Sequence, residues 1–197
     1  MAEFVLVIPI LLVLFVAIAD FGRIFATSIQ LEAATRNAAE AAANEYVANP
    51  PGPLNAPAPA GNAAYYDPLH TVAADVVCAE LRDLPNTNYD AGTNTCPDMP
   101  VVIVCVQDSQ DTSCAGPASP GVGGIPAACS SLVAGPTNVQ TTNPDGTKPR
   151  SVEVRTCYRF SAILNLSLFS LGDFWLQNTA SFTVPCYFAI GDPSECG

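Results

Sequence analysis

The chain has 197 residues, only 13% of them charged, and a formal net charge of −11. Its seven Lys and Arg residues are scattered along the sequence, so no basic patch is available to neutralise a row of phosphates. We therefore expect no nucleic-acid partner. An acidic balance of this kind is typical of a solvated exterior.

The first 48 residues predict one long helix. An apolar run from Phe4 to Ala19, in which Pro9 is the one residue outside the apolar set, continues into an Ala-rich stretch that ends near Ala48. No linker separates the two halves, and the sequence Asn49-Pro50-Pro51-Gly52-Pro53 ends the helix. At 1.5 Å per residue the helix would be about 70 Å long, more than a bilayer core requires.

Three interpretations of the apolar run are open. A membrane helix usually has about 20 apolar residues, so this run is slightly short. A secretory signal needs a basic region before the run and a small-residue cleavage site after it. Here Glu3 precedes the run and Asp20-Phe21-Gly22-Arg23 follows it. A core helix would be hard to cover in a domain of this size, so we favour a membrane or self-assembling helix.

The charges beside the apolar run need partners, because a charge inside a membrane or a helix bundle is costly. Asp20 has Arg23 three residues further on. Glu3 has no cation within reach in its own helix, so it either pairs with a cation such as the N-terminal amine of a neighbouring chain or sits favourably at the helix N-terminus. We expect Pro9 to kink the helix and Gly22 to weaken it.

The second half of the helix carries Glu32, Arg36 and Glu40 at i, i+4 spacing on one face. The order Glu32 before Arg36 is the favourable one, and the trio is typical of a solvated helix face. The alanines around it allow close approach of neighbouring helices.

Residues 49–66 form a Pro/Ala-rich connector, and we expect residues 67–197 to form one extracytoplasmic domain. A helix is predicted over Asp67 to Leu84, where Val72, Val76 and Ala79 recur at helical spacing. A long loop is predicted from Asp108 to Lys148, where Ser, Gly, Pro, Asn and Thr dominate.

Strands are predicted at Val101 to Val106, at Ser151 to Phe160 and within Phe174 to Ile190. In the second of these, Val152, Val154, Thr156, Tyr158 and Phe160 alternate with polar residues and Cys157. Residues 162–171 are either a strand or a packed loop. The predicted fold is therefore α+β: a long N-terminal hydrophobic helix, then a disulfide-linked antiparallel β-rich domain with a second short helix.

The eight cysteines all follow the N-terminal helix, and no two have the C-x-x-C spacing that zinc and thioredoxin-like sites usually show. Disulfides formed in an oxidising compartment are the better interpretation, although the sequence does not choose the pairing. The disulfide candidates are Cys78, Cys96, Cys105, Cys114, Cys129, Cys157, Cys186 and Cys196.

The sequence offers no catalytic, cofactor or metal site, and we expect the protein not to be an enzyme. His70 is the single histidine, which leaves no His-based triad, and we expect it to be structural or exposed. Nucleotide-binding and nucleophile-elbow motifs are missing from the sequence. Trp175 is most simply a core or interface anchor.

The opening residues resemble the TadE-like pilins of the tight-adherence (Flp) branch of type IV pilins. The likeness rests on Ala2-Glu3-Phe4, the apolar run with Pro9, Asp20-Phe21-Gly22-Arg23 and the Ala-rich helix that follows. It implies that a prepilin peptidase cleaves a short leader and that the protein is inserted in the cytoplasmic membrane before assembly. Pilus assembly machinery would then extract it into a helical filament. In that family a glutamate pairs with a neighbour's N-terminal amine, and Glu3 matches it.

The predicted function is a structural one: a subunit of a Tad-like pilus or related extracellular filament that self-associates through its N-terminal helix, for adhesion or surface attachment. The residues expected to serve assembly are Glu3, Phe4, Pro9, Asp20 and Arg23. The alternative is a minor pilin or a monomeric, membrane-anchored extracytoplasmic binding module.

Overall fold

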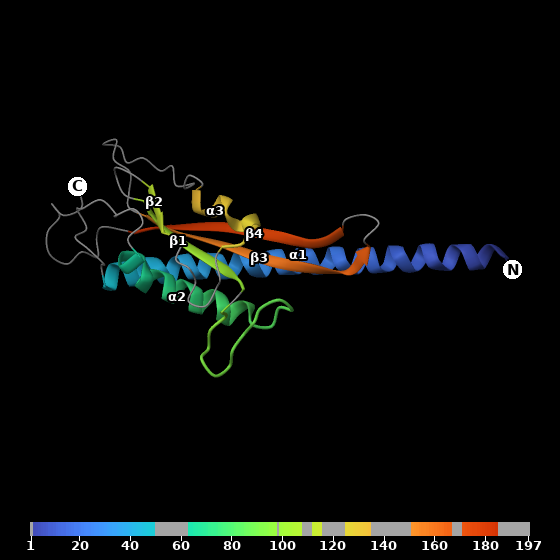
Figure 1. The fold of residues 1–197 in the computed structure, drawn as a ribbon, viewed down its shortest axis with the longest axis horizontal. Coiled ribbons are helices and arrows are strands. Elements are labelled where there is room, and N and C mark those ends of the chain that lie inside the picture. The colour runs from blue at the N-terminus through green and yellow to red at the C-terminus, as the bar shows by residue number, and fades with distance from the viewer. Residues whose placement is uncertain are drawn as a thin grey trace.

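The structure is a computed structural model, and it describes residues 2–49, 63–97, 99–107, 112–115, 125–134, 151–166 and 171–184. A long helix, α1, projects from one side of a small α+β domain, with the N-terminus at its free end (Figure 1). The predicted α+β fold is confirmed. The elements are α1 (Ala2–Ala48), α2 (Ala63–Leu81), β1 (Val101–Gln107), β2 (Thr112–Ala115), η1 (Ala127–Cys129), α3 (Ser131–Ala134), β3 (Ser151–Leu166) and β4 (Leu171–Thr183).

The helix α1 is continuous from Ala2 to Ala48, with Pro9 inside it and Gly22 in its middle. Neither residue divides it into two elements. Its second half lies against α2, β3 and β4, and it supplies much of the core through small side chains. The buried apolar residues of this half are Leu31, Ala34, Ala38, Ala39, Ala42, Ala43 and Tyr46.

The described strands form one antiparallel sheet in the order β2-β1-β3-β4. The alternation predicted for Ser151 to Phe160 is confirmed, because Val154 and Tyr158 join the helix-facing core while Cys157 faces the other side. In the register, Val154 lies opposite both Val104 of β1 and Ala180 of β4. Residues 162–166 continue β3, which pairs with β4 as a hairpin.

The second helix, α2, begins earlier than predicted and ends at Leu81. The residues whose spacing predicted this helix do not form its buried row: Val72 and Val76 are half-buried and Ala79 is exposed. The buried row is shifted by one residue toward the C-terminus, to Ala73 and Val77, and it begins with the large side chains of Tyr66 and Leu69. The buried residues of α2 are Tyr66, Leu69, His70, Ala73, Val77, Cys78 and Leu81.

The prediction of a long loop from Asp108 to Lys148 is wrong in part. The strand β2 lies in this region and pairs with β1, and η1 with α3 lies on the face of the sheet away from α1 and α2 (Figure 1). Short elements of this kind have no propensity of their own and form by packing on the sheet. Asp108 and Lys148 lie outside the described residues.

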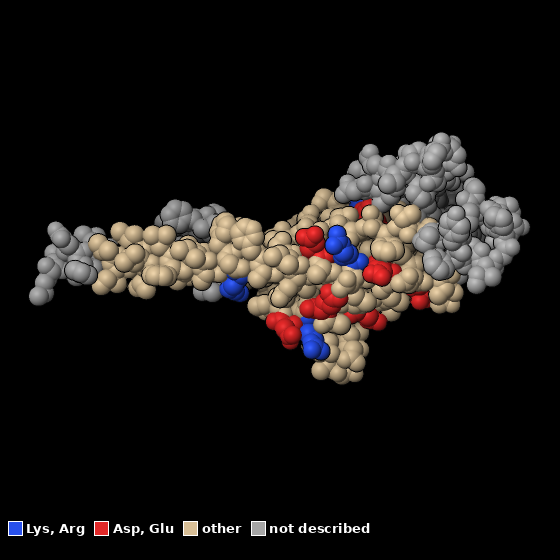
Figure 2. Space-filling view, turned by 180° about the vertical axis from the view of Figure 1, so that it is seen from behind, with Lys and Arg blue, Asp and Glu red and all other residues tan. Residues whose placement is uncertain are grey.

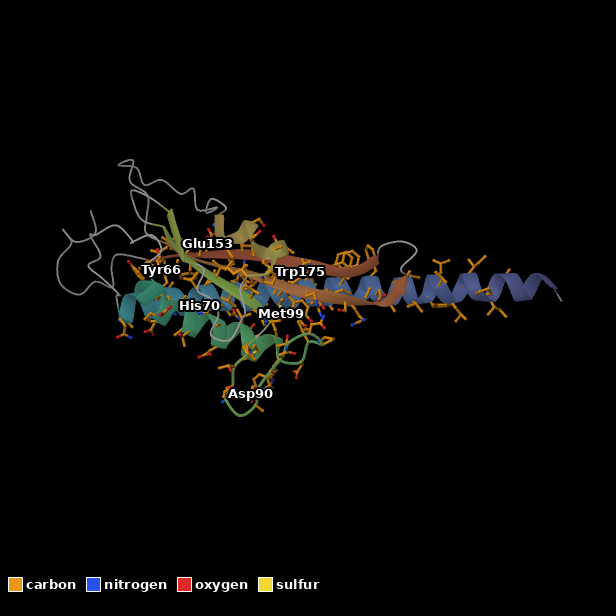
Figure 3. All side chains as sticks on the ribbon, viewed as in Figure 1. Tyr66, His70, Asp90, Met99, Glu153 and Trp175 are labelled. Carbon is orange, nitrogen blue, oxygen red and sulfur yellow. A yellow bond between two sulfur atoms is a disulfide. The ribbon has the colours of Figure 1, made fainter. Side chains whose placement is uncertain are left out.

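The structure describes both partners of two disulfides. Cys78–Cys96 closes the loop after α2, which projects from the domain and carries Asp90 (Figure 3). Cys129–Cys157 joins η1 to the middle of β3. Cys105 is also disulfide-bonded and lies opposite Cys114 in the β1–β2 register. Cys186 and Cys196 lie outside the described residues.

Candidate assembly site on the N-terminal helix

The two faces of α1 differ sharply. One face packs against the sheet and α2, beginning at the buried Asp20 and Thr27. The opposite face keeps large apolar side chains exposed along the projecting half and for a further two turns beside the domain. There Phe21, Phe25 and Ile29 are 64%, 59% and 66% exposed. The face has the i, i+4 spacing that places side chains in one row on a helix.

From Val7 to Ala19 every residue of the projecting half of α1 except Pro9 is apolar, and the face of this stretch seen in Figure 2 carries no charged side chain. Charged side chains gather instead over the globular part of the molecule. Pro9, Ile10, Val13 and Leu14 line a shallow apolar hollow on the projecting half. A helix that is apolar all round needs either lipid or another apolar surface to cover it.

An ion pair marks the level at which α1 meets the domain. Arg23 Nη1 lies 3.3 Å from Asp20 Oδ1, and the Arg23 guanidinium carbon lies 5.2 Å from the centre of the Phe160 ring. Asp20 and Phe160 are both buried, so Arg23 connects a carboxylate of the helix with an aromatic ring of β3. These contacts connect α1 to β3 at Asp20, the first buried residue of the helix from Val7 onward.

Of the five residues predicted for assembly, the structure brings only Asp20 and Arg23 together. Glu3 and Phe4 belong to the start of α1, and their side chains lie outside the described part of the structure. Pro9 lies three turns before Asp20, about 16 Å along the helix. The predicted residues are thus spread along α1 and do not form one compact site.

Sequence reasoning missed the exposed row of Phe21, Phe25 and Ile29. The signal was present, since the three residues follow each other at i, i+4 spacing on a helix that was itself predicted. Phe21 and Phe25 also contact each other, with ring centroids 5.5 Å apart. The sequence did not show that this row is exposed, because apolar residues in this stretch could equally have faced the core.

Gly22 lies in this exposed face. A β-carbon added at Gly22 would meet no atom within 4 Å, so nothing inside the chain requires a glycine there. Glycine inside a helix costs about 0.5–1 kcal/mol relative to alanine. Ile18, Phe21 and Phe25, which lie within one turn of Gly22 on the helix, are all exposed.

Two buried titratable groups with shifted pKa values, His70 and Tyr158, connect elements of the domain. His70 Nε2 lies 3.1 Å from the carbonyl oxygen of Val102, and this contact joins helix α2 to strand β1 of the sheet (Figure 3). Burial lowers the pKa of His70 from its usual value, against the opposite effects of the Val102 carbonyl and of Asp67 and Asp75. Its expected structural role is consistent with this position.

Tyr158 is the second such group, and it lies in the core on β3. Burial raises the pKa of the Tyr158 hydroxyl, against opposing effects of Asn86 and Arg23. The Asn86 backbone N–H donates to Tyr158 Oη at 3.2 Å, and its side chain donates to the Arg159 carbonyl at 2.6 Å. These contacts fasten the segment after α2 to β3. Within the described residues, no group of three or more His, Cys, Asp or Glu could hold a metal ion.

The geometry defines a protein with an apolar helical stalk on an α+β head. Within the described residues, α1 is the one helix that is long and apolar enough to cross a membrane. Residues 1–40 match the family model described as TadE-like protein. The match confirms the TadE-like resemblance over these residues and supports a Tad-pilus-associated, pilin-type protein. No curated protein and no solved structure matches the chain.

Proposed function

We propose that this chain is a structural subunit of a Tad-type pilus or related extracellular filament. The observation that carries the proposal is the apolar exposure of α1, which extends from Val7 to Ile29 on the side away from the sheet. The TadE-like match covers the same part of the chain. A structural role of this kind requires no catalytic residue, and we propose none.

Before assembly, the projecting half of α1 would hold the subunit in the cytoplasmic membrane. Lipid can cover the stretch from Val7 to Ile18, whose large side chains are exposed in the single chain. By resemblance, a prepilin peptidase and pilus assembly machinery would process and extract the subunit. In the filament, copies of α1 would cover one another, with apolar burial contributing about 25 cal/mol per Å².

The domain would then form the outer surface of the filament. Its helix-facing core is built on the second half of α1, so that the head and the stalk are one folded unit. The disulfides Cys78–Cys96 and Cys129–Cys157 suit an oxidising, extracytoplasmic setting. Adhesion or surface attachment would depend on this outer surface.

Electron microscopy of the native protein tests the proposal. We expect helical filaments built from one type of subunit. If the protein is found only as detergent-soluble monomers, the filament role is rejected in favour of a membrane-anchored binding module. If it is found only as a rare component of filaments built from another subunit, the minor-pilin alternative holds instead.

A further inference from the structure

Charged residues of the stalk helix and of the β3–β4 hairpin lie near one level, where α1 meets the domain. Arg23 of α1 pairs with Asp20, and its guanidinium carbon lies 5.2 Å from the centre of the Phe160 ring. On the hairpin, Arg159 immediately precedes Phe160, and Asp173 lies opposite the residue that follows Phe160. The helix and the hairpin therefore share one charged level.

Beyond this level, the hairpin extends along α1 toward the N-terminus of the chain. Thr35 of α1 contacts Thr156 of β3, whereas Arg23, about three turns earlier on α1, contacts Phe160. The strand β3 continues to Leu166, about 20 Å beyond Phe160. In Figure 1 the end of the hairpin accordingly reaches past the rest of the domain, toward the projecting half of α1.

Neither element carries a charged residue on the N-terminal side of the charged level. The helix has none from Phe4 to Ala19, and the hairpin has none over residues 160–172, most of which are apolar. A hairpin end that lies in water usually carries polar turn residues instead of a run of apolar ones. The hairpin end thus has the same requirement as the adjacent half of α1, which is an apolar environment such as lipid.

Strand pairing limits how deeply the hairpin can enter a bilayer. The strand β1 pairs with β3 no further than Cys157, so among the described strands residues 158–166 pair only with β4. Open strand edges do not occur within the hydrocarbon core, because their backbone groups would lack hydrogen bonds. At the headgroup–acyl boundary, water and headgroups can still supply these bonds.

The length of the hairpin fits this boundary. A bilayer has a headgroup layer of about 5–8 Å on each side of its hydrocarbon core. Elements that lie at the interface are buried a further 5–10 Å or so. A hairpin that extends about 20 Å past a charged level at the outer edge of the headgroups therefore ends at the boundary.

We propose that the hairpin end, residues 162–166 and 171–172, is inserted into the headgroup–acyl boundary of a lipid bilayer beside α1. The molecule would then have two membrane contacts, a spanning helix and an interfacial hairpin, which together hold the domain at a fixed angle to the membrane. Apolar burial drives the second contact, since a net charge of −11 gives no attraction to anionic headgroups. The inference rests on the membrane stage of the proposed function.

A tryptophan placed at the hairpin end reports what covers it. Trp175 is the one tryptophan of the chain, so Trp175→Phe removes the background emission. In this background, Leu171→Trp probes the hairpin end and Val13→Trp probes the projecting half of α1. Ser181→Trp, at an exposed position further along β4, is the matched control. The full-length variants are reconstituted in phosphatidylcholine vesicles, and their emission is measured with brominated acyl chains and, separately, with iodide in the water.

We expect brominated lipid to quench Leu171→Trp, most strongly when the bromine lies near the headgroup end of the chain, while iodide has little effect. Val13→Trp should be quenched most by bromine near the end of the acyl chain, and Ser181→Trp by iodide alone. Quenching of Leu171→Trp by iodide and not by lipid would show that water covers the hairpin end. Protection from both quenchers would show that protein, such as a second copy, covers it, and either result overturns the inference.

Leu166 lies opposite Leu171 in the hairpin register and provides a second test. Leu166→Trp is an independent probe of the same end and should behave as Leu171→Trp does. Adding Leu166→Asp to Leu171→Trp should reduce quenching by lipid and increase quenching by iodide, because a carboxylate is costly in an apolar environment. Unchanged quenching would contradict apolar burial as the driving force. Thermal unfolding of each variant verifies that the domain is folded.

The Val13→Trp probe separates this inference from the proposed function. If brominated lipid quenches Val13→Trp but neither hairpin probe, the hairpin contact is wrong while α1 still enters the membrane. If it quenches none of the three, the membrane stage of the proposed function fails as well.

Discussion

The hydroxyl oxygens of Thr35 on α1 and Thr156 on β3 lie 2.6 Å apart in the core, and both residues are completely buried. Thr35 Oγ1 also lies 2.6 Å from the carbonyl oxygen of Leu31, to which it donates. Thr35 has one hydroxyl proton, so Thr156 is the donor in the bond between the two threonines. This bond joins the stalk helix to the central strand of the sheet.

Thr35→Val should lower the free energy of unfolding by about 1–3 kcal/mol, because the Thr156 hydroxyl is left buried without an acceptor. Thr156→Val should have a smaller effect, since Thr35 keeps its bond to Leu31. The double variant should be more stable than the sum of the single effects predicts. Urea unfolding followed by circular dichroism measures all three, and additive losses would show that the bond does not couple the two residues.

A buried ion pair lies on the opposite face of the sheet. Arg155 Nε lies 2.5 Å from Glu153 Oε1, and both side chains are almost completely buried beneath η1 and α3. Arg155 also donates to the carbonyl of Leu132, and Gln177 donates to the carbonyl of Ala128 at 2.7 Å. Together with Cys129–Cys157, these bonds hold the covering segment on the sheet.

Glu153→Gln should destabilise the domain by about 3 kcal/mol, because it leaves the buried Arg155 charge without its counter-charge. Arg82→Gln serves as the control. Arg82 is an exposed partner of Asp83, and loss of such a surface pair has an effect of about 0–1 kcal/mol. Equal unfolding midpoints for Glu153→Gln and the unaltered chain would contradict the role assigned to the pair.

The elements governed by local patterns could be predicted from the sequence. The helix α1 was predicted almost to its last residue, since the Pro-rich sequence after Ala48 cannot continue a helix. The two faces of β3 followed from strict alternation of apolar and polar residues. Both signals depend only on residues close in sequence.

The rest depends on contacts between distant parts of the chain. Nothing near Glu153 and Arg155 indicates that a segment more than twenty residues earlier covers them and buries their charges. The buried row of α2 could not be chosen from the sequence, because several apolar residues share similar spacing and only tertiary packing selects Leu69 and Val77. The row of Phe21 and Phe25 was not separated from the core for the same reason.

His70 should make stability depend on pH. Its folded-state pKa is lowered by burial, so below about pH 6.5 the unfolded chain binds a proton that the folded chain does not. The contribution is therefore present above that pH and is lost as the pH falls. In His70→Gln the decrease in melting temperature between about pH 7.5 and pH 5.5 should be smaller. An identical decrease in both proteins would show that His70 is not the group responsible.

The Cys129–Cys157 disulfide should stabilise the domain by restricting the unfolded chain. The two cysteines are 28 residues apart, for which loop-closure entropy predicts roughly 3–4 kcal/mol. Replacing both by alanine should lower the unfolding midpoint accordingly. Removing Cys78–Cys96, which closes an 18-residue separation on an exposed loop, should have a similar or slightly smaller effect. A far larger loss for the exposed loop would contradict the entropic account.

Glu3→Ala should separate assembly from folding. By resemblance, the Glu3 carboxylate pairs with the N-terminal amine of a neighbouring chain, and the substitution removes that charge. The core begins at Leu31, about 40 Å further along α1, so the unfolding transition of the domain should not change. Filament yield, counted by electron microscopy, should fall strongly. Asp83→Ala, which removes an exposed acid from the domain, is the control and should assemble normally. Normal filament yield in Glu3→Ala would show that assembly does not use this pairing, because the loss of charge would then have no effect on contacts between subunits.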